Sequence, residues 1–274
     1  ILDAFVDWIW NTFFYYLNSF NIFLLTNVLG PMKQAYLNMP VISTFILFMG
    51  AGYIIGGLRS CLIVGSLILF IALSEYWDRT LITLYMATFA VGVSAISGII
   101  VGSLCSQNDF ASKSILSICD FFQTFPSFIY LIPVILLFGI TDTSVMIAAI
   151  VYASVPATRY TVEGLRSVPS SLHDAGSMSG VSKLQRWRLI DLPLALPHIM
   201  LGINQTVIFA LMMIVLGALI GTEDLGQLIM GSLSRPNGAG IGFTLGIFIS
   251  FICLAVDNLI RTWADERKKL LGIE

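Results

Sequence analysis

The sequence predicts an all-α polytopic membrane protein of about seven transmembrane helices, with an N-terminal interfacial helical segment. Of its 274 residues, 57% are hydrophobic and 11% are charged, whereas a soluble domain carries about 25% charged residues. Long charge-free stretches recur along the chain. This composition argues against a soluble enzyme, and a formal net charge of −2 gives no attraction to nucleic acid.

Charge-free intervals give the expected spans, because a transmembrane helix needs about 20 mainly apolar residues. They cover residues 34–58, 60–74, 80–108, 121–141, 143–158, 192–222 and 236–256. Residues 60–74 and 143–158 are short, and the second interval can extend past Arg159, whose side chain can reach an interface. Residues 40–77 are thus expected to form two accessory transmembrane helices.

Residues 1–39 have a different composition. Asp3 and Asp7 lie among tryptophan, tyrosine, phenylalanine and leucine residues, a mixture that suits a helix lying in the plane of the membrane interface. An eighth span is the alternative. The pairs Gly30-Pro31 and Met39-Pro40 are expected to break any helix here.

Lysine and arginine predict the orientation, because they accumulate on the cytoplasmic side. With the N-terminus outside and seven spans following, eleven of the fourteen fall inside. The inside set is Arg59, Lys113, Arg159, Arg166, Lys183, Arg186, Arg188, Arg261, Arg267, Lys268 and Lys269, and the outside set is Lys33, Arg79 and Arg235. The C-terminus is therefore expected in the cytoplasm.

The polar stretch 159–191 holds five of the basic residues between two spans. Ser171 and Ser182 are suited to cap helices, so two short cytoplasmic helices are expected. From His173 to Pro193 the sequence resembles the EAA loop of binding-protein-dependent ABC importer permeases. The matching residues are Asp174, Ala175, Gly176, Gly180, Ile190, Leu192 and Pro193.

The spacing of that pattern fits throughout, while Asp174 replaces glutamate and Gly176 replaces alanine. The resemblance implies that residues 168–193 couple the chain to a separate ATPase, with Pro193 starting the next span. The chain has no GxxxxGK[ST] loop. We therefore expect no enzyme activity in this chain, no cofactor of its own, and ATP and Mg²⁺ on two partner ABC ATPase subunits.

Three further segments resemble glycine betaine/proline betaine permeases of the ProU type: residues 120–133, 202–206 and 225–227. The resemblance covers about residues 75–262, so residues 78–274 are expected to form the permease core. It implies a multi-pass protein of the bacterial cytoplasmic (inner) membrane that works with a second copy of itself and an external substrate-binding protein.

The expected cargo is a quaternary ammonium solute, with glycine betaine first. Choline, carnitine, trimethylamine N-oxide and dimethylsulfoniopropionate remain open, and an ion-coupled secondary transporter is a distant alternative. The five tryptophans lie near expected interfaces, so the aromatic cage that selects the cation is expected on the binding protein. The histidines, His173 and His198, and four scattered cysteines suggest no metal site.

A translocation path within the chain is a separate expectation. Pro126 and Pro133 free backbone groups that the bundle must satisfy, and side-chain amides are unfavourable facing lipid. The expected path and gate residues are Gln123, Phe125, Pro126, Tyr130, Asn204, Gln205, Met212 and Met213. Simple helix packing by the same residues is the alternative. Asp120 and Asp257 form either an ion relay or pairs with a nearby base such as Lys113 or Arg261.

Overall fold

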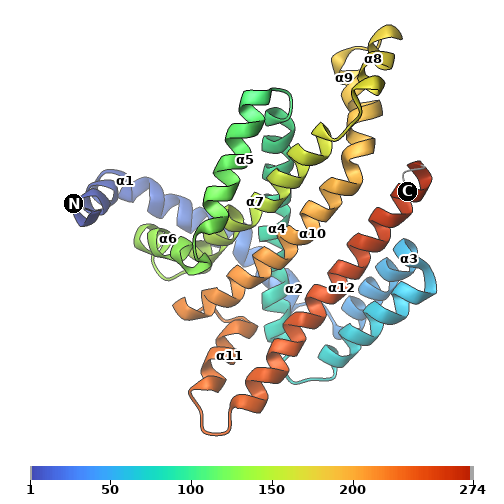
Figure 1. The fold of residues 1–274 in the computed structure, drawn as a ribbon. Coiled ribbons are helices and arrows are strands. Elements are labelled where there is room, and N and C mark those ends of the chain that lie inside the picture. Colours follow the sequence, from blue (N-terminus) through green and yellow to red (C-terminus); the bar gives the residue numbers. More distant parts are fainter. Residues whose placement is uncertain (1, 272–274) are drawn as a thin grey trace.

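A computed structural model describes residues 2–271, and within that range the side chains of 2–7, 9–11, 173, 175, 177 and 271 lie outside the description. Every regular element over these residues is helical, as the sequence predicts (Figure 1). The elements are α1 (Leu2–Leu24), η1 (Leu25–Leu29), α2 (Gly30–Leu37), α3 (Val41–Ala72), α4 (Trp77–Cys105), α5 (Asp109–Thr124), η2 (Ser127–Tyr130), α6 (Leu131–Phe138), α7 (Asp142–Arg166), α8 (Ser170–Met178), α9 (Lys183–Arg186), η3 (Trp187–Asp191), α10 (Leu192–Gly217), η4 (Ala218–Ile220), α11 (Leu225–Leu233) and α12 (Ala239–Leu271).

Counted over the described residues by helix length and apolar composition, with α3 taken as one helix, the candidate spans number five or six. Within the described residues, five helices are long and apolar enough to cross a membrane, and a bent pair gives a sixth. The five are α3, α4, α7, the continuous helix Lys183–Ile220 and α12, and the bent pair joins α5 to Ser127–Phe138. The expected number of seven is therefore not confirmed, whereas the membrane-spanning helical class is.

α3 is a helical hairpin rather than one straight rod. Gly57 has φ 64° and ψ −157°, a conformation that is essentially open only to glycine, and the chain reverses there between the arms 41–55 and 58–72. A Cβ on Gly52 would lie 3.0 Å from the Cα of Cys61, so the two arms touch. Each arm is shorter than the about 20 residues of a full crossing, and two accessory transmembrane helices stay a prediction.

Two π-helical turns each lie just before a proline. η1 precedes Pro31, and η3 precedes Pro193. A proline inside a helix has no N–H to donate, and its ring crowds the carbonyl four residues back; the wider turn relieves that crowding. In both cases the N–H after the turn donates to the carbonyl five residues back. The expected break at Gly30-Pro31 is therefore wrong, and so is the expectation that Pro193 starts a span, because both helices continue.

The span expected over residues 121–141 begins earlier, at Asp109, and is broken. The chain bends by 103° between α5 and the segment Ser127–Phe138. Phe125 at the bend has an extended backbone with ψ 137°, because Pro126 disfavours a helical conformation in the residue before it. A helix end thus lies within one candidate span.

α7 is the central helix, packed between α4 and α10 (Figure 1). Glycines allow this close approach: a Cβ on Gly98 of α4 would lie 2.5 Å from the Cβ of Ala157, and one on Gly202 of α10 would lie 2.7 Å from the Cβ of Tyr160. In a membrane, where burial from water no longer drives helix association, such van der Waals contact holds helices together.

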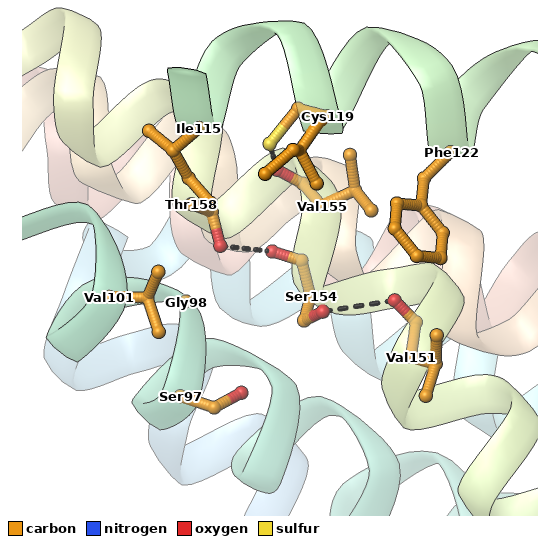
Figure 2. A pocket seen from close by; sticks show the side chains of 11 residues that line it. Ser97, Gly98, Val101, Ile115, Cys119, Phe122, Val151, Ser154, Val155 and Thr158 are labelled. Carbon is orange, nitrogen blue, oxygen red and sulfur yellow. Dashed lines mark hydrogen bonds between the residues drawn. The ribbon is translucent and has the colours of Figure 1, made fainter. Parts of the chain in front are cut away.

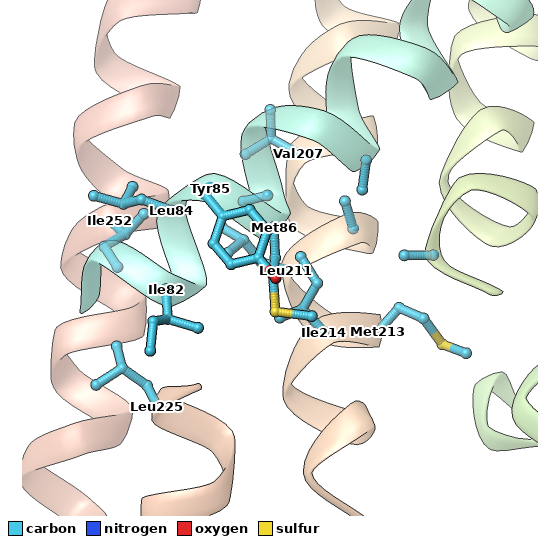
Figure 3. Packing of buried hydrophobic residues seen from close by; sticks show 14 of the residues in the cluster. Ile82, Leu84, Tyr85, Met86, Val207, Leu211, Met213, Ile214, Leu225 and Ile252 are labelled. Carbon is cyan, nitrogen blue, oxygen red and sulfur yellow. The ribbon is translucent and has the colours of Figure 1, made fainter. Parts of the chain in front are cut away.

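A large buried cluster lies at the end of the bundle opposite α8. Figure 3 shows side chains of α4, α10, α11 and α12 meeting around Tyr85 and Leu211. The Tyr85 hydroxyl donates to a carboxylate oxygen of Asp142, at the start of α7, over 2.6 Å. This hydrogen bond ties α4 to α7 within the apolar cluster.

Basic residues expected on opposite sides of the membrane lie at opposite ends of the bundle. Lys33 pairs with Glu223 over 3.2 Å, and Arg79 donates to the Glu223 carbonyl over 2.7 Å. Lys33 and Arg79 both belong to the set expected outside. At the opposite end Arg166 pairs with Asp109. Which end faces the cytoplasm stays a prediction.

Asp224 is fully buried beside the Lys33–Glu223 pair. Its carboxylate caps α11 by accepting from the Gln227 N–H over 3.1 Å. Burial raises the pKa of Asp224 to about 7, and the nearby Asp142 acts in the same direction. At Glu223, by contrast, the Lys33 ammonium lowers the pKa.

Candidate coupling segment and translocation path

Residues 168–193 form a tight helix–turn–helix at the end of the molecule where α12 also ends (Figure 1). α8 ends at Met178, and Gly180 in the turn after it has a φ of 72°, a left-handed conformation that favours glycine. The Val181 N–H donates back to the Gly176 carbonyl over 3.2 Å, which is the six-to-one bond of a Schellman cap. Gly180 is therefore required by the turn.

The next helix begins with a capping box. Ser182 accepts from the Gln185 N–H, and the Gln185 side chain accepts from the Ser182 N–H, so the predicted cap at Ser182 is confirmed. Ser171 lies inside α8, so that predicted cap is wrong. Two short helices with well-defined ends follow one another here, as expected.

Gly176 and Ile190 explain the fixed spacing of the motif. Gly176 is buried, and a Cβ there would lie 3.1 Å from Cδ1 of Ile190. Alanine, which the family pattern has at this position, would make the Ile190 side chain shift slightly. The two motif positions thus pack against each other across the turn, and Leu192 packs against a small buried cluster of Leu165, Ala195 and Ile199.

The candidate coupling segment, residues 168–193, also exposes large apolar side chains. Met178 is 90% exposed, and Asp174 is exposed as well, while the Ala175 side chain lies outside the described ones. Apolar side chains that stand out from a polar segment mark an interaction surface. The exposed apolar residues are Leu172, Met178, Leu184 and Leu189.

Four of the expected path residues lie around the helix break after α5. Gln123 accepts from Nη1 of Arg159 over 2.9 Å. Phe125 and Pro126 form the exposed bend itself. The Tyr130 hydroxyl donates to the Phe122 carbonyl. The structure therefore brings these four together.

The other four lie on α10 and do not form one surface. Asn204 is buried and donates to Asp257 of α12 over 2.6 Å. Gln205 is half-buried and Met212 is exposed. Met213 is fully buried in the core, so it faces no open space within this chain.

Asp257 also accepts from Nε of Arg261 over 2.6 Å, which agrees with the paired alternative. Asp120 pairs with Arg159 instead of the expected Lys113. Arg159 in turn contacts Glu163 over 3.3 Å. The sequence predicted only that Arg159 reaches an interface, whereas it joins α5 to α7.

A polar face along α5 is a further feature that the sequence reasoning missed. Its members recur at helical spacing and are all exposed: Lys113, Ser117, Asp120 and Thr124. Exposed polar side chains inside a span face a water-filled space or another subunit rather than lipid. Helical periodicity over residues 109–124 was the signal that could have found this face.

The opposite face of α5 borders a cavity of about 220 Å³ between α4, α5 and α7. Its polar side chains are turned back to helix carbonyls, as Figure 2 shows for Ser154, Thr158 and Cys119. The cavity therefore presents hydrocarbon surface and no charge, which does not suit a charged solute.

Comparison with known proteins assigns the family. Residues 94–269 match the family described as "Binding-protein-dependent transport system inner membrane component". The chain is 62% identical to the trimethylamine N-oxide transport system permease protein TmoV of Pelagibacter ubique (strain HTCC1062), over 98% of this chain and 37% of that protein. It is 38% identical to TmoV of Ruegeria pomeroyi (strain ATCC 700808 / DSM 15171 / DSS-3), over 93% of this chain and 39% of that protein.

It is also 31% identical to the glycine betaine transport system permease protein OpuAB of Bacillus subtilis (strain 168), over 98% of this chain and 94% of that protein. The chain thus spans less than half the length of the two TmoV proteins and nearly all of OpuAB. The expected resemblance is confirmed: this chain belongs to the family of binding-protein-dependent transport system inner membrane components.

Proposed function

We propose that this chain is the transmembrane permease part of an ATP-driven ABC importer for methylated amine solutes. The observation that carries the proposal is the coupling segment 168–193, whose fixed turn and exposed apolar side chains suit docking to a separate protein. ATP and Mg²⁺ would bind to two partner ATPase subunits, and this chain would hydrolyse nothing itself.

The continuous helix after the turn suggests how motion reaches the membrane. α9, η3 and α10 form one helix over Lys183–Ile220, so a displacement of the docked turn is transmitted directly to a membrane helix. The π-helical turn at η3 is the point along this helix where the backbone hydrogen-bond register changes. Closure of the ATPases would thereby shift α10 against α7.

Other parts of the proposed assembly follow from the family. They are a second copy of this chain, an external substrate-binding protein, and the bacterial inner membrane with the N-terminus outside and the C-terminus in the cytoplasm. The path would run along the polar face of α5 and past Gln123, Phe125, Pro126 and Tyr130, since these residues combine exposed polar groups with a helix end inside a span.

Trimethylamine N-oxide is the first solute to test. Glycine betaine led the sequence-based expectation, but the 62% identity is to a protein named for trimethylamine N-oxide, and the glycine betaine permease shares 31%. Choline and carnitine are further candidates, and so is dimethylsulfoniopropionate, in which a sulfonium takes the place of the methylated nitrogen.

Reconstitution into liposomes tests the proposal. The full assembly should accumulate radiolabelled trimethylamine N-oxide only with ATP inside the compartment that holds the ATPases and with the binding protein on the other side. Uptake driven by a sodium or proton gradient without ATP would contradict the proposal and support the secondary-transporter alternative.

A further inference from the structure

Two exposed aromatic rings lie beside the polar face of α5, at its C-terminal end. Phe121 and Phe125 are 59% and 37% exposed, and their ring centroids lie 4.8 Å apart in an edge-to-face pair. Faces of aromatic rings attract methylated ammonium groups once these leave water. Rings at a helix break are therefore suited to contact a cation that moves along this face.

The backbone at the break has the same electrostatic preference. α5 ends at Thr124, and its end carries partial negative charge. Hydroxyls of Thr124 and Tyr130 donate to the carbonyls of Phe121 and Phe122, and the remaining carbonyls of the last turn have no partner within the helix. The 103° bend directs the following segment away from the axis of α5. Helix ends inside a span bind charged groups in other transport proteins.

An ion cluster lies one helical turn nearer the start of α5. Arg159 reaches Asp120 through Nη2, Glu163 through Nε and Gln123 through Nη1. Two carboxylates face one guanidinium, which leaves one negative charge in excess when all are ionised. The Arg159 side chain is still 28% exposed, and a guanidinium has five N–H donors, so donors remain for another oxygen anion.

We propose that the end of α5 and the Arg159 cluster form a transient solute site within the path, which rests on the proposed import of methylated amines. The methyl groups would lie against the rings of Phe121 and Phe125 near the helix end, and the oxygen anion of the solute would accept from Arg159. A purely structural link between α5 and α7 requires neither the surplus carboxylate nor the exposed rings. The site suits solutes that carry both a methylated nitrogen cation and an oxygen anion.

The test measures binding to the permease–ATPase complex in lipid nanodiscs, without the binding protein, by saturation-transfer NMR on the N-methyl protons of trimethylamine N-oxide. The wild-type complex should give a saturation-transfer signal. Phe121→Leu and Phe125→Leu keep apolar volume but remove the ring faces, and each should lower the signal about three- to tenfold. Phe110→Leu, an 81% exposed phenylalanine in the first turn of the same helix, is the matched control and should not change it.

Arg159→Lys keeps the positive charge but loses the planar fork of donors. It should weaken binding of trimethylamine N-oxide more than binding of choline, which has no oxygen anion, whereas a structural role would weaken both equally. Two outcomes would overturn the site and leave the importer proposal intact, provided that transport proceeds. One is the absence of a saturation-transfer signal from the wild-type complex, and the other is a signal of wild-type size in both ring variants. A wild-type assembly that imports no methylated amine would instead contradict the proposed function.

Discussion

The contact of α4 with α7 through Gly98 predicts a stability difference between two glycine-to-alanine changes in the same helix. At Gly98 the new Cβ would lie 2.5 Å from the Cβ of Ala157 and 2.9 Å from the Thr158 nitrogen, whereas carbon atoms normally pack at about 3.5–4.0 Å. The helices must therefore separate by about 1 Å, and overpacking of this kind costs about 1–3 kcal/mol. At Gly92 a Cβ meets nothing within 4 Å.

Both changes gain the same helix propensity, about 1 kcal/mol. The difference in stability between the two variants therefore measures the cost of the close packing at Gly98. Thermal unfolding of the purified protein in detergent should give a lower Tm for Gly98→Ala than for Gly92→Ala, by roughly 2–4 °C for each kcal/mol. Gly92→Ala should equal or exceed wild type. Equal Tm values for the two variants would refute the close α4–α7 packing.

Two other predictions concern the ends of the bundle. Gly180→Ala places a side chain in the left-handed turn, which costs about 1–2 kcal/mol, and should reduce the amount of ATPase that co-purifies with the chain. Gly231→Ala is the control, because a Cβ there would meet nothing within 4 Å, and it should leave co-purification unchanged. Equal ATPase retention by the two variants would contradict the role of the turn. Because the pKa of Asp224 is raised to about 7 in the folded chain and is about 3.9 in an unfolded one, the folded state binds this proton more tightly. The protonated Asp224 carboxyl contributes its full stabilisation below about pH 4. As the pH rises from about 4 to about 7, this contribution to the free energy of unfolding falls by up to about 1.4 kcal/mol per pH unit. Asp224→Asn keeps the cap of α11 and should flatten this pH dependence of Tm, and an unchanged slope would argue against the buried carboxyl as its source.

Local signals in the sequence were enough for the helical membrane class and the coupling turn. Composition and charge-free runs predict the helical membrane class. The turn can be predicted because its residues, such as Gly180 and the capping residue Ser182, act through local backbone geometry. The contact between Gly176 and Ile190 gives a physical reason for spacing that the sequence showed only as a pattern.

Features that depend on how helices lie against each other were not predictable in the same way. Arg159 was expected to reach an interface, but its partner Asp120 depends on the register between α5 and α7. Pro31 and Pro193 were expected to break or start helices, because single-residue propensity does not reveal that a π-helical turn can absorb a proline. The reversal at Gly57, by contrast, lies beside Arg59, where the charge-free intervals 34–58 and 60–74 meet, so a turn was expected there.

The docking of an ATPase to the coupling segment is the central claim, and site-specific photocrosslinking tests it most directly. A photoreactive amino acid at Met178, which is 90% exposed in this segment, should form an adduct with the ATPase subunit in the assembled transporter, and one at Phe243, which is 74% exposed near the start of α12, should not. An adduct at Phe243 but none at Met178, in an assembly that still hydrolyses ATP and imports solute, would contradict the account.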